Sequence, residues 1–265
     1  MCNLLYRKTS NSSDREGGTH MIVSFIEMYS AMIMLIVFSA LAFYSLLLII
    51  KITPIYLEYK KSEYRNESGV GAIKVIFDRG VRGEFLIFRE IEEKWRGYNK
   101  TLTNLYLPKK DGTTTEIDLV MINQYGIYVI ESKNYSGKIY GSDKYKEWTQ
   151  YFPHKKYKFY NPVWQNSLHV NSLKNTINLE EREIVHSLVV FGDRCELKKV
   201  QTAKKGVRIF QRKELVSTLE QDREVSGKVY FTTNEIDDRY AELKKYSLQD
   251  NIVKENHIKN IQKNI

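Results

Sequence analysis

The sequence predicts an α/β domain that is preceded by one transmembrane helix. Two observations carry this prediction: an uninterrupted apolar segment at residues 28–50 and, after it, short β-branched runs that alternate with segments of helical periodicity. With 265 residues, the chain has room for one ordinary domain and some appendages. Its 28% charged and 42% hydrophobic residues are typical of a globular chain rather than a disordered one.

The apolar segment at residues 28–50 contains no charged side chain, and roughly 20 apolar residues suffice for a helix to cross a bilayer core. A buried core helix is the alternative, but such a helix is rarely apolar on every face. Basic residues are concentrated just after the segment, which by the positive-inside rule places the C-terminal side of a single-pass cell-membrane protein in the cytoplasm. Residues 1–27 are expected to form a disordered extracytoplasmic segment, and residues 51–75 a juxtamembrane linker.

The net charge of +9 lies entirely after residue 50, because the first fifty residues hold equal numbers of basic and acidic side chains. A basic domain favours nucleic acid or an anionic membrane as its partner, although surface lysines that merely aid solubility explain the charge equally well. The two cysteines, Cys2 and Cys195, exclude a disulfide framework and a cysteine-rich metal site. No H-x-x-x-H pair occurs, which argues against a histidine-built zinc site.

Residues 76–225 are predicted to form the domain, and residues 226–265 a helical tail rich in Lys and Asn. A helix is expected at 82–96, where apolar residues recur on one stripe. Asn161 and Pro162 have the residue types of a helix N-cap and first position, and open a helix of about four turns. Further helices are expected at 212–220 and 235–246, and strands at 102–107, 114–122, 127–133, 138–140, 184–191 and 207–210.

Two of these strands are predicted to form a hairpin that brings two acidic residues together. Residues 123–126 have the composition of a four-residue hairpin loop, which would pair Ile122 with Ile127. Asp118 then lies opposite Glu131, and opposed residues have Cβ atoms about 4.5–5.5 Å apart. Two carboxylates so placed repel each other unless a proton or cation intervenes, and Mg²⁺ prefers such oxygen ligands. A register slip of one residue would remove this arrangement.

Two more charged residues belong to the same neighbourhood. Lys133 shares a strand face with Glu131, and a structural ion pair with Glu116 is the alternative explanation for it. Because the strands are otherwise very apolar, a functional site is favoured over a solvated face. Glu84 falls on the apolar stripe of the 82–96 helix, where a carboxylate needs a partner. An acid placed against the helix dipole is the alternative for Glu84.

At these positions the sequence resembles the nuclease-related domain family, NERD, a branch of the PD-(D/E)xK nuclease superfamily. The resemblance covers roughly residues 80–195, and its most specific part is the run from Gly126 to Gly137. Ile117 stands where the superfamily usually has a proline before the first acid. The resemblance implies a restriction-endonuclease-like mixed sheet flanked by helices. The remaining matching pieces are Gly83-Glu84, Glu116-Ile117-Asp118, Trp148, Asn161-Pro162, Gln165 and His169.

The resemblance also implies a role for each site residue. Asp118 and Glu131 would bind Mg²⁺ or Mn²⁺, with the carbonyl of Ser132 as a further ligand. Lys133 would orient the attacking water or help to deprotonate it, and would stabilise charge on the phosphate. Glu84 would complete the acidic site from the helix.

Substrate contacts are less strongly indicated. Gln165 matches a helix-borne glutamine that hydrogen-bonds the lysine or the phosphate, and a solvated helix residue is its alternative. Residues 151–160 interleave three lysines with five aromatic residues, which suits phosphates and unpaired bases. A strand with tyrosines in the core and lysines in solvent explains that run equally well. Lysines at residues 198–205 indicate a solvated loop, and either run could face anionic lipid.

The leading hypothesis is a metal-dependent deoxyribonuclease held at the inner membrane face, with DNA as its partner. The first alternative is a catalytically inactive nuclease-fold module that binds DNA or a protein partner at the membrane. The second is a membrane-surface scaffold whose basic patches meet lipid. Metal dependence separates the first hypothesis from the other two, and DNA binding in EDTA separates the two alternatives.

Overall fold

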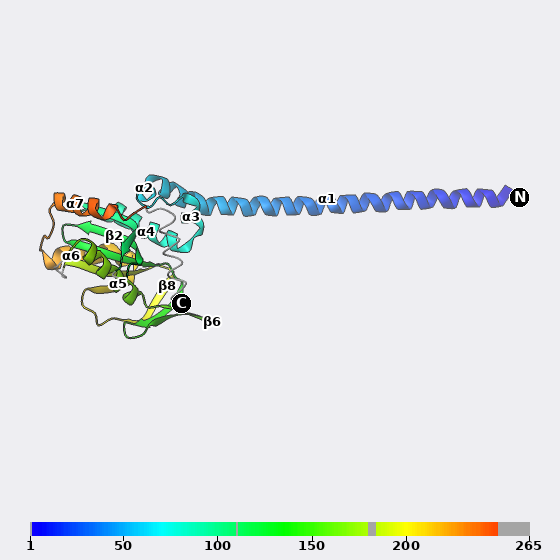
Figure 1. Cartoon of the computed structure of the whole chain (residues 1–265). Helices are drawn as coiled ribbons and strands as arrows, with labels where there is room; N and C mark the ends of the chain where they lie inside the picture. The colour runs from blue at the N-terminus through cyan, green and yellow to red at the C-terminus, as the bar shows by residue number, and fades with distance from the viewer. Residues whose placement is uncertain (1, 110, 180–183, 249–265) are drawn as a thin grey trace. The chain divides into compact units, whose positions relative to one another are not determined.

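The computed structural model describes residues 2–109, 111–179 and 184–248 (Figure 1). The chain divides into two compact units, Met1–Ile55 and Tyr56–Ile265. Helix α1 (Cys2–Lys61) makes up the first unit and ends in the second. Within it, Val23–Lys61 is long and apolar enough to cross a membrane. The helix begins at Cys2, contrary to the disorder expected for residues 1–27, and the chain before Pro54 has no proline that would end it.

Residues 56–75 are part of the folded unit, so the linker predicted at 51–75 is wrong for this stretch. The end of α1 is followed by α2 (Tyr64–Ser68) and α3 (Ala72–Phe77). Tyr59 and Tyr64 are buried, and both rings meet Phe85 of α4 (Arg79–Lys94) edge-on, with centroids 6.2 Å and 5.4 Å away. Burial of these aromatic rings offsets the entropy lost when a charged stretch is ordered.

The larger sheet is mixed, as the predicted fold class requires. Its order is β1-β2-β3-β7-β9, with the first three strands antiparallel and the last three parallel. Ile122 pairs with Ile127 as predicted, but Asn123 also pairs with Gly126, so the hairpin turn is shorter than expected. The five strands are β1 (Asn99–Pro108), β2 (Thr114–Asn123), β3 (Gly126–Lys133), β7 (Val185–Phe191) and β9 (Val207–Gln211).

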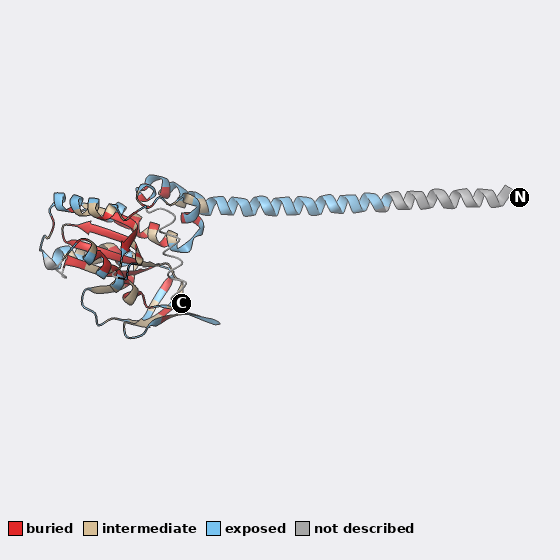
Figure 2. Cartoon of the chain, viewed as in Figure 1, coloured by how far each residue is buried: buried red, intermediate tan, exposed pale blue. Residues whose placement is uncertain are grey.

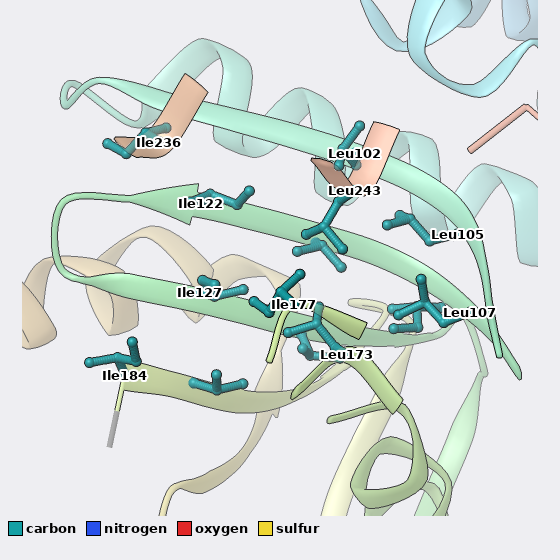
Figure 3. Close-up of a cluster of buried hydrophobic side chains, with 14 of the residues drawn as sticks. Leu102, Leu105, Leu107, Ile122, Ile127, Leu173, Ile177, Ile184, Ile236 and Leu243 are labelled. Atoms are coloured by element: carbon teal, nitrogen blue, oxygen red, sulfur yellow. The ribbon is translucent and has the colours of Figure 1, made fainter. Parts of the chain in front are cut away.

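Helices α5 (Pro162–Thr176) and α7 (Thr233–Lys244) pack on this sheet and build the main core (Figure 3). The side chain of Asn161 caps α5 by accepting hydrogen bonds from the first helical N–H groups, as predicted. Ile236 and Leu243 of α7 are fully buried, so this helix belongs to the domain and not to a separate tail. Two further helical segments are η2 (Arg212–Glu214) and α6 (Leu215–Ser226), and residues 249–265 of the predicted tail lie outside the described residues.

A second, four-stranded sheet has the order β6-β5-β4-β8. Its strands are β4 (Gly137–Ser142), β5 (Glu147–Phe152), β6 (Lys155–Tyr160) and β8 (Cys195–Gln201). The ring of Trp148 is fully buried and lies parallel to that of Phe191. The loop expected at 198–205 is wrong for its first part, because Lys198 and Lys199 lie on β8 between Leu197 and Val200, which pack against the buried cluster. Strand β6 is exposed along most of its length (Figure 2).

Candidate functional site

Asp118 lies where the β1–β2 pairing is interrupted and the β2–β3 pairing ends. The β1–β2 pairing skips Asn104, which lies across from Asp118 and has a left-handed φ of +52°. The β2–β3 pairing ends one residue before Asp118 and Glu131 would face each other. The Oδ2 atom of Asp118 instead accepts a hydrogen bond of 2.7 Å from the backbone N–H of Ser132. The predicted register therefore holds up to the site, and there the sheet opens around a half-buried carboxylate.

Both carboxylate oxygens of Glu131 are engaged, and its side chain is only 1% exposed. Oε1 lies 2.6 Å from Nζ of Lys133, and Oε2 lies 3.0 Å from Nε2 of His169. The other ring nitrogen of His169 lies 2.8 Å from the Thr115 hydroxyl. Burial alone would raise the pKa of Glu131, but Lys133 and His169 outweigh it and hold that pKa below its ordinary value. Glu131 is thus an ionised carboxylate with a fixed orientation.

Lys133 connects β3 to helix α5. Its Nζ donates a hydrogen bond of 3.1 Å to Oε1 of Gln165, the contact expected for that glutamine. Burial lowers the pKa of Lys133, but the carboxylates of Glu131 and Asp118 raise it by more. The pKa of Lys133 therefore lies above its ordinary value. The ammonium group is therefore charged at neutral pH, which favours the charge-stabilising role predicted for Lys133 over a proton-accepting one.

Glu84 joins the acidic group from helix α4. It is half-buried, and its Oε2 accepts a hydrogen bond of 3.4 Å from the hydroxyl of Tyr64. Burial and the charge of Glu116 raise the pKa of Glu84 to about 8, against the lowering effect of Tyr64. Burial, then the charges of Glu131 and Glu84, raise the pKa of Asp118 well above its ordinary value. Without a cation, Glu84 and Asp118 therefore keep their protons at a higher pH than ordinary carboxyl groups, because their charged forms are buried and repel each other.

The chemistry of this donor set fits a hard divalent cation in part. Glu84 and Asp118 offer carboxylate oxygens on partly exposed side chains, and a cation would relieve their repulsion. Across the described ranges, no three His, Cys, Asp or Glu side chains converge closely enough to hold a metal ion. Glu131 faces Lys133 and His169, so a cation there would have to replace the ammonium group at Oε1.

Sequence reasoning assigned no role to His169, which orients Glu131. The available signal was its spacing of four residues from Gln165, which places both side chains on one face of α5. Asn166, between them, was also missed. Its Nδ2 donates to the carbonyls of Val129 and Leu188, and so ties α5 to strands β3 and β7 behind the site.

Comparison with known proteins identifies the family. The model of the nuclease-related domain family, NERD, matches residues 79–192. An uncharacterized protein of Bacillus anthracis is 30% identical over 181 residues, which are 68% of this chain and 82% of that protein. This chain belongs to the NERD family. The NERD match contains all the predicted site residues, from Glu84 to Gln165. No solved structure matches the chain significantly.

Proposed function

We propose that this NERD protein is a membrane-anchored, metal-dependent nuclease that hydrolyses DNA phosphodiester bonds. The observation that carries the proposal is the buried Glu131–Lys133 ion pair next to Asp118, at the point where the sheet opens. Phosphodiester hydrolysis needs an activated water and positive charge on the phosphate. An acidic cluster with one fixed ammonium group is suited to both needs.

Asp118, Glu131 and the carbonyl of Ser132 would hold the cation, with Glu84 completing the acidic site. A bound Mg²⁺ or Mn²⁺ would supply charge on the phosphate and a water of lowered pKa. Lys133 would donate a hydrogen bond to a phosphate oxygen and offset the charge that develops there.

The residues of α5 would keep this arrangement in place. Gln165 accepts a hydrogen bond from Lys133 and so restricts the position of its Nζ. His169, itself bonded to Thr115, fixes one oxygen of Glu131 and leaves the other for the lysine or the cation. Such supporting contacts orient metal ligands and usually matter for activity.

DNA is the proposed partner because the folded unit exposes positive charge together with aromatic rings. Strand β6 presents Tyr157 and Tyr160, 49% and 42% exposed, together with the exposed lysines 155, 156 and 158. Lysines neutralise phosphates, and exposed rings stack on unpaired bases. For the membrane location, the apolar part of α1 would form the anchor. The basic residues that follow this apolar part would keep the nuclease domain in the cytoplasm.

One observation favours the alternative of a catalytically inactive module that binds DNA or a protein at the membrane. Both oxygens of Glu131 already have partners, and a closed ion pair can serve the fold alone. A cleavage assay separates the two functions.

The test uses the full chain in a non-ionic detergent, incubated with supercoiled plasmid or single-stranded DNA in Mg²⁺, Mn²⁺ or EDTA. The Glu131→Ala and Lys133→Ala variants are compared with Glu196→Ala and Lys198→Ala, which break an exposed Glu–Lys pair on β8. Circular dichroism checks that each variant is folded. We expect cleavage with either cation that EDTA and only the first two substitutions abolish. Folded protein that binds DNA in every condition and never cuts it would refute the nuclease and leave the binding module.

A further inference from the structure

A small cleft opens directly beside the candidate site. Its volume is about 240 Å³, and it lies between the first turns of α4, the end of β3 and the turn after β7. Ser132 lines the cleft, and its backbone N–H is the group that binds Asp118. The cleft is thus at the carboxyl ends of the parallel strands β3 and β7, the edge at which α/β sheets commonly bind ligands.

The cleft carries positive charge that the protein does not neutralise. Of its three arginines, Arg212 is paired with both Glu90 and Asp193. Neither Arg82 nor Arg194 forms an ion pair with an acidic side chain among the residues that the structure describes, and their charges repel each other. Two like charges at one small cleft are stabilised when an anion binds between them.

The side chains around the cleft are held by specific hydrogen bonds. Nε of Arg82 donates to the carbonyl of Val75 at 3.1 Å, which fixes one edge of the guanidinium group. Asn134 donates through Nδ2 to the carbonyl of Arg79 at 2.7 Å, and its Oδ1 lies 3.5 Å from a terminal nitrogen of Arg194. One arginine is therefore anchored, while the other is exposed and reaches the cleft from outside.

Two glycines allow the backbone segments to approach each other at the cleft. A Cβ atom at Gly83 would lie 2.7 Å from Cβ of Asn134 and 2.9 Å from Oγ of Ser132. A Cβ atom at Gly192 would lie 2.5 Å from Oδ1 of Asn134. Larger residues at these positions would push Asn134 away and change the cleft, so its shape depends on both glycines.

We propose that this cleft binds one phosphate group of the nucleic-acid strand, adjacent to the phosphate that meets the carboxylate site. The inference depends on the proposed function, because it takes nucleic acid as the ligand. Guanidinium groups match phosphate oxygens with paired N–H donors, and Arg82 and Arg194 would grip the phosphate from two sides. The volume is below the roughly 300–1,000 Å³ of pockets for drug-sized ligands, which suits a phosphate rather than a whole nucleotide.

The test is fluorescence anisotropy of labelled oligonucleotides, single-stranded and duplex, with the full chain in non-ionic detergent and EDTA. Arg194→Ala is the main variant because Arg194 is exposed and its loss should leave the fold intact. Arg223→Ala, an exposed arginine on α6, is the charge-matched control. Loss of one phosphate contact should weaken duplex binding about eightfold in 0.1 M salt, and should reduce the slope of log K against log salt concentration by about 0.9. For single strands we expect binding to weaken about fivefold and the slope to fall by about 0.7.

Oligonucleotides with 5′-phosphate and 5′-hydroxyl ends identify which phosphate is bound. Equal weakening on both ends supports an internal phosphate, and weakening confined to the phosphorylated end supports a terminal one. The proposal is overturned if Arg194→Ala binds the 5′-phosphate and 5′-hydroxyl oligonucleotides as tightly as Arg223→Ala does. It is also overturned if, in a parallel binding assay, Arg194→Ala weakens binding to phosphatidylglycerol vesicles but not to DNA. DNA binding is measured in EDTA and does not depend on cleavage. A protein that binds DNA but never cuts it would therefore refute the nuclease, whereas the phosphate-binding cleft would still be tested by the affinity of Arg194→Ala.

Discussion

Replacement of Tyr64 by alanine is expected to destabilise the folded unit by about 3–5 kcal/mol. Tyr64 is 0% exposed, and its ring meets those of Phe85 and Phe88 at centroid distances of 5.4 Å and 5.5 Å. Alanine would leave a cavity and remove two aromatic pairs, each worth about 0.5–1.5 kcal/mol beyond burial. Tyr64→Phe keeps the ring and loses the hydroxyl with its 3.4 Å hydrogen bond to Glu84, so it should cost about 1 kcal/mol.

The assay is urea unfolding of the full chain in detergent, followed by tryptophan fluorescence. All three tryptophans lie in the second unit, so the signal reports on it alone. With an m-value of about 3 kcal/mol/M, the Tyr64→Ala midpoint should fall by about 1–1.7 M. Tyr145→Ala is the control, because Tyr145 is 67% exposed and should change stability by less than about 0.5 kcal/mol. A Tyr64→Ala midpoint equal to that of the control would show that residues 56–68 are a linker after all.

Three further predictions concern the interior of the same unit. Burial raises the pKa of the Cys195 thiol to about 11, so at pH 8 only roughly 0.1% of it is thiolate. In a Cys2→Ser background we expect Cys195 not to react with Ellman's reagent until urea unfolds the protein. Prompt reaction of the native protein would contradict this prediction. Gly83→Ala, whose methyl would lie 2.7 Å from the nearest side-chain carbon, should cost about 1–3 kcal/mol in urea unfolding. Gly80→Ala in the same helix, with its closest contact at 3.3 Å, is the control, and equal stabilities would refute the packing argument. Asn166→Ala should cost about 2–4 kcal/mol, since buried acceptors on two strands lose their donor, and a midpoint unchanged from wild type would show that water replaces it.

The β2–β3 hairpin is the part of the fold that local pattern predicts best. Two apolar runs joined by a short connection form a hairpin whose register follows from the connection, and Ile122 pairs with Ile127 accordingly. An apolar run does not tell where a ladder ends. The divergence at Asp118 depends on the bond between its side chain and the N–H of Ser132, which no periodicity encodes.

The segments that were missed are short. Helices α2 and α3 have five and six residues, and the buried ring of Tyr64 on α2 is held by Phe85 of α4, a contact that local periodicity does not show. Strand β8 carries Lys198 and Lys199 as exposed neighbours, a pattern that resembles a solvated loop, whereas a strand was one of the two interpretations left open for β6. In such segments, tertiary contacts decide the structure and local propensity does not.

The same distinction applies to the candidate site. Asp118, Glu131 and Lys133 lie within one hairpin, so strand geometry alone brings them together. His169 reaches Glu131 across 38 residues, and Arg194 reaches Asn134 across 60. Contacts at that separation depend on how α5 and the turn after β7 pack, which a single sequence does not reveal.

The most direct measurement of the central claim is the single-turnover rate of DNA cleavage by Lys133→Met at saturating DNA and Mg²⁺. Lys138→Met is the matched control, because Lys138 is an exposed lysine on β4. If Lys133 stabilises charge on the reacting phosphate, its replacement should lower the rate by about 10²–10³-fold, whereas the control should stay within about threefold of wild type. A folded Lys133→Met protein that cuts DNA as fast as Lys138→Met would contradict the assignment of this hairpin as the hydrolytic site.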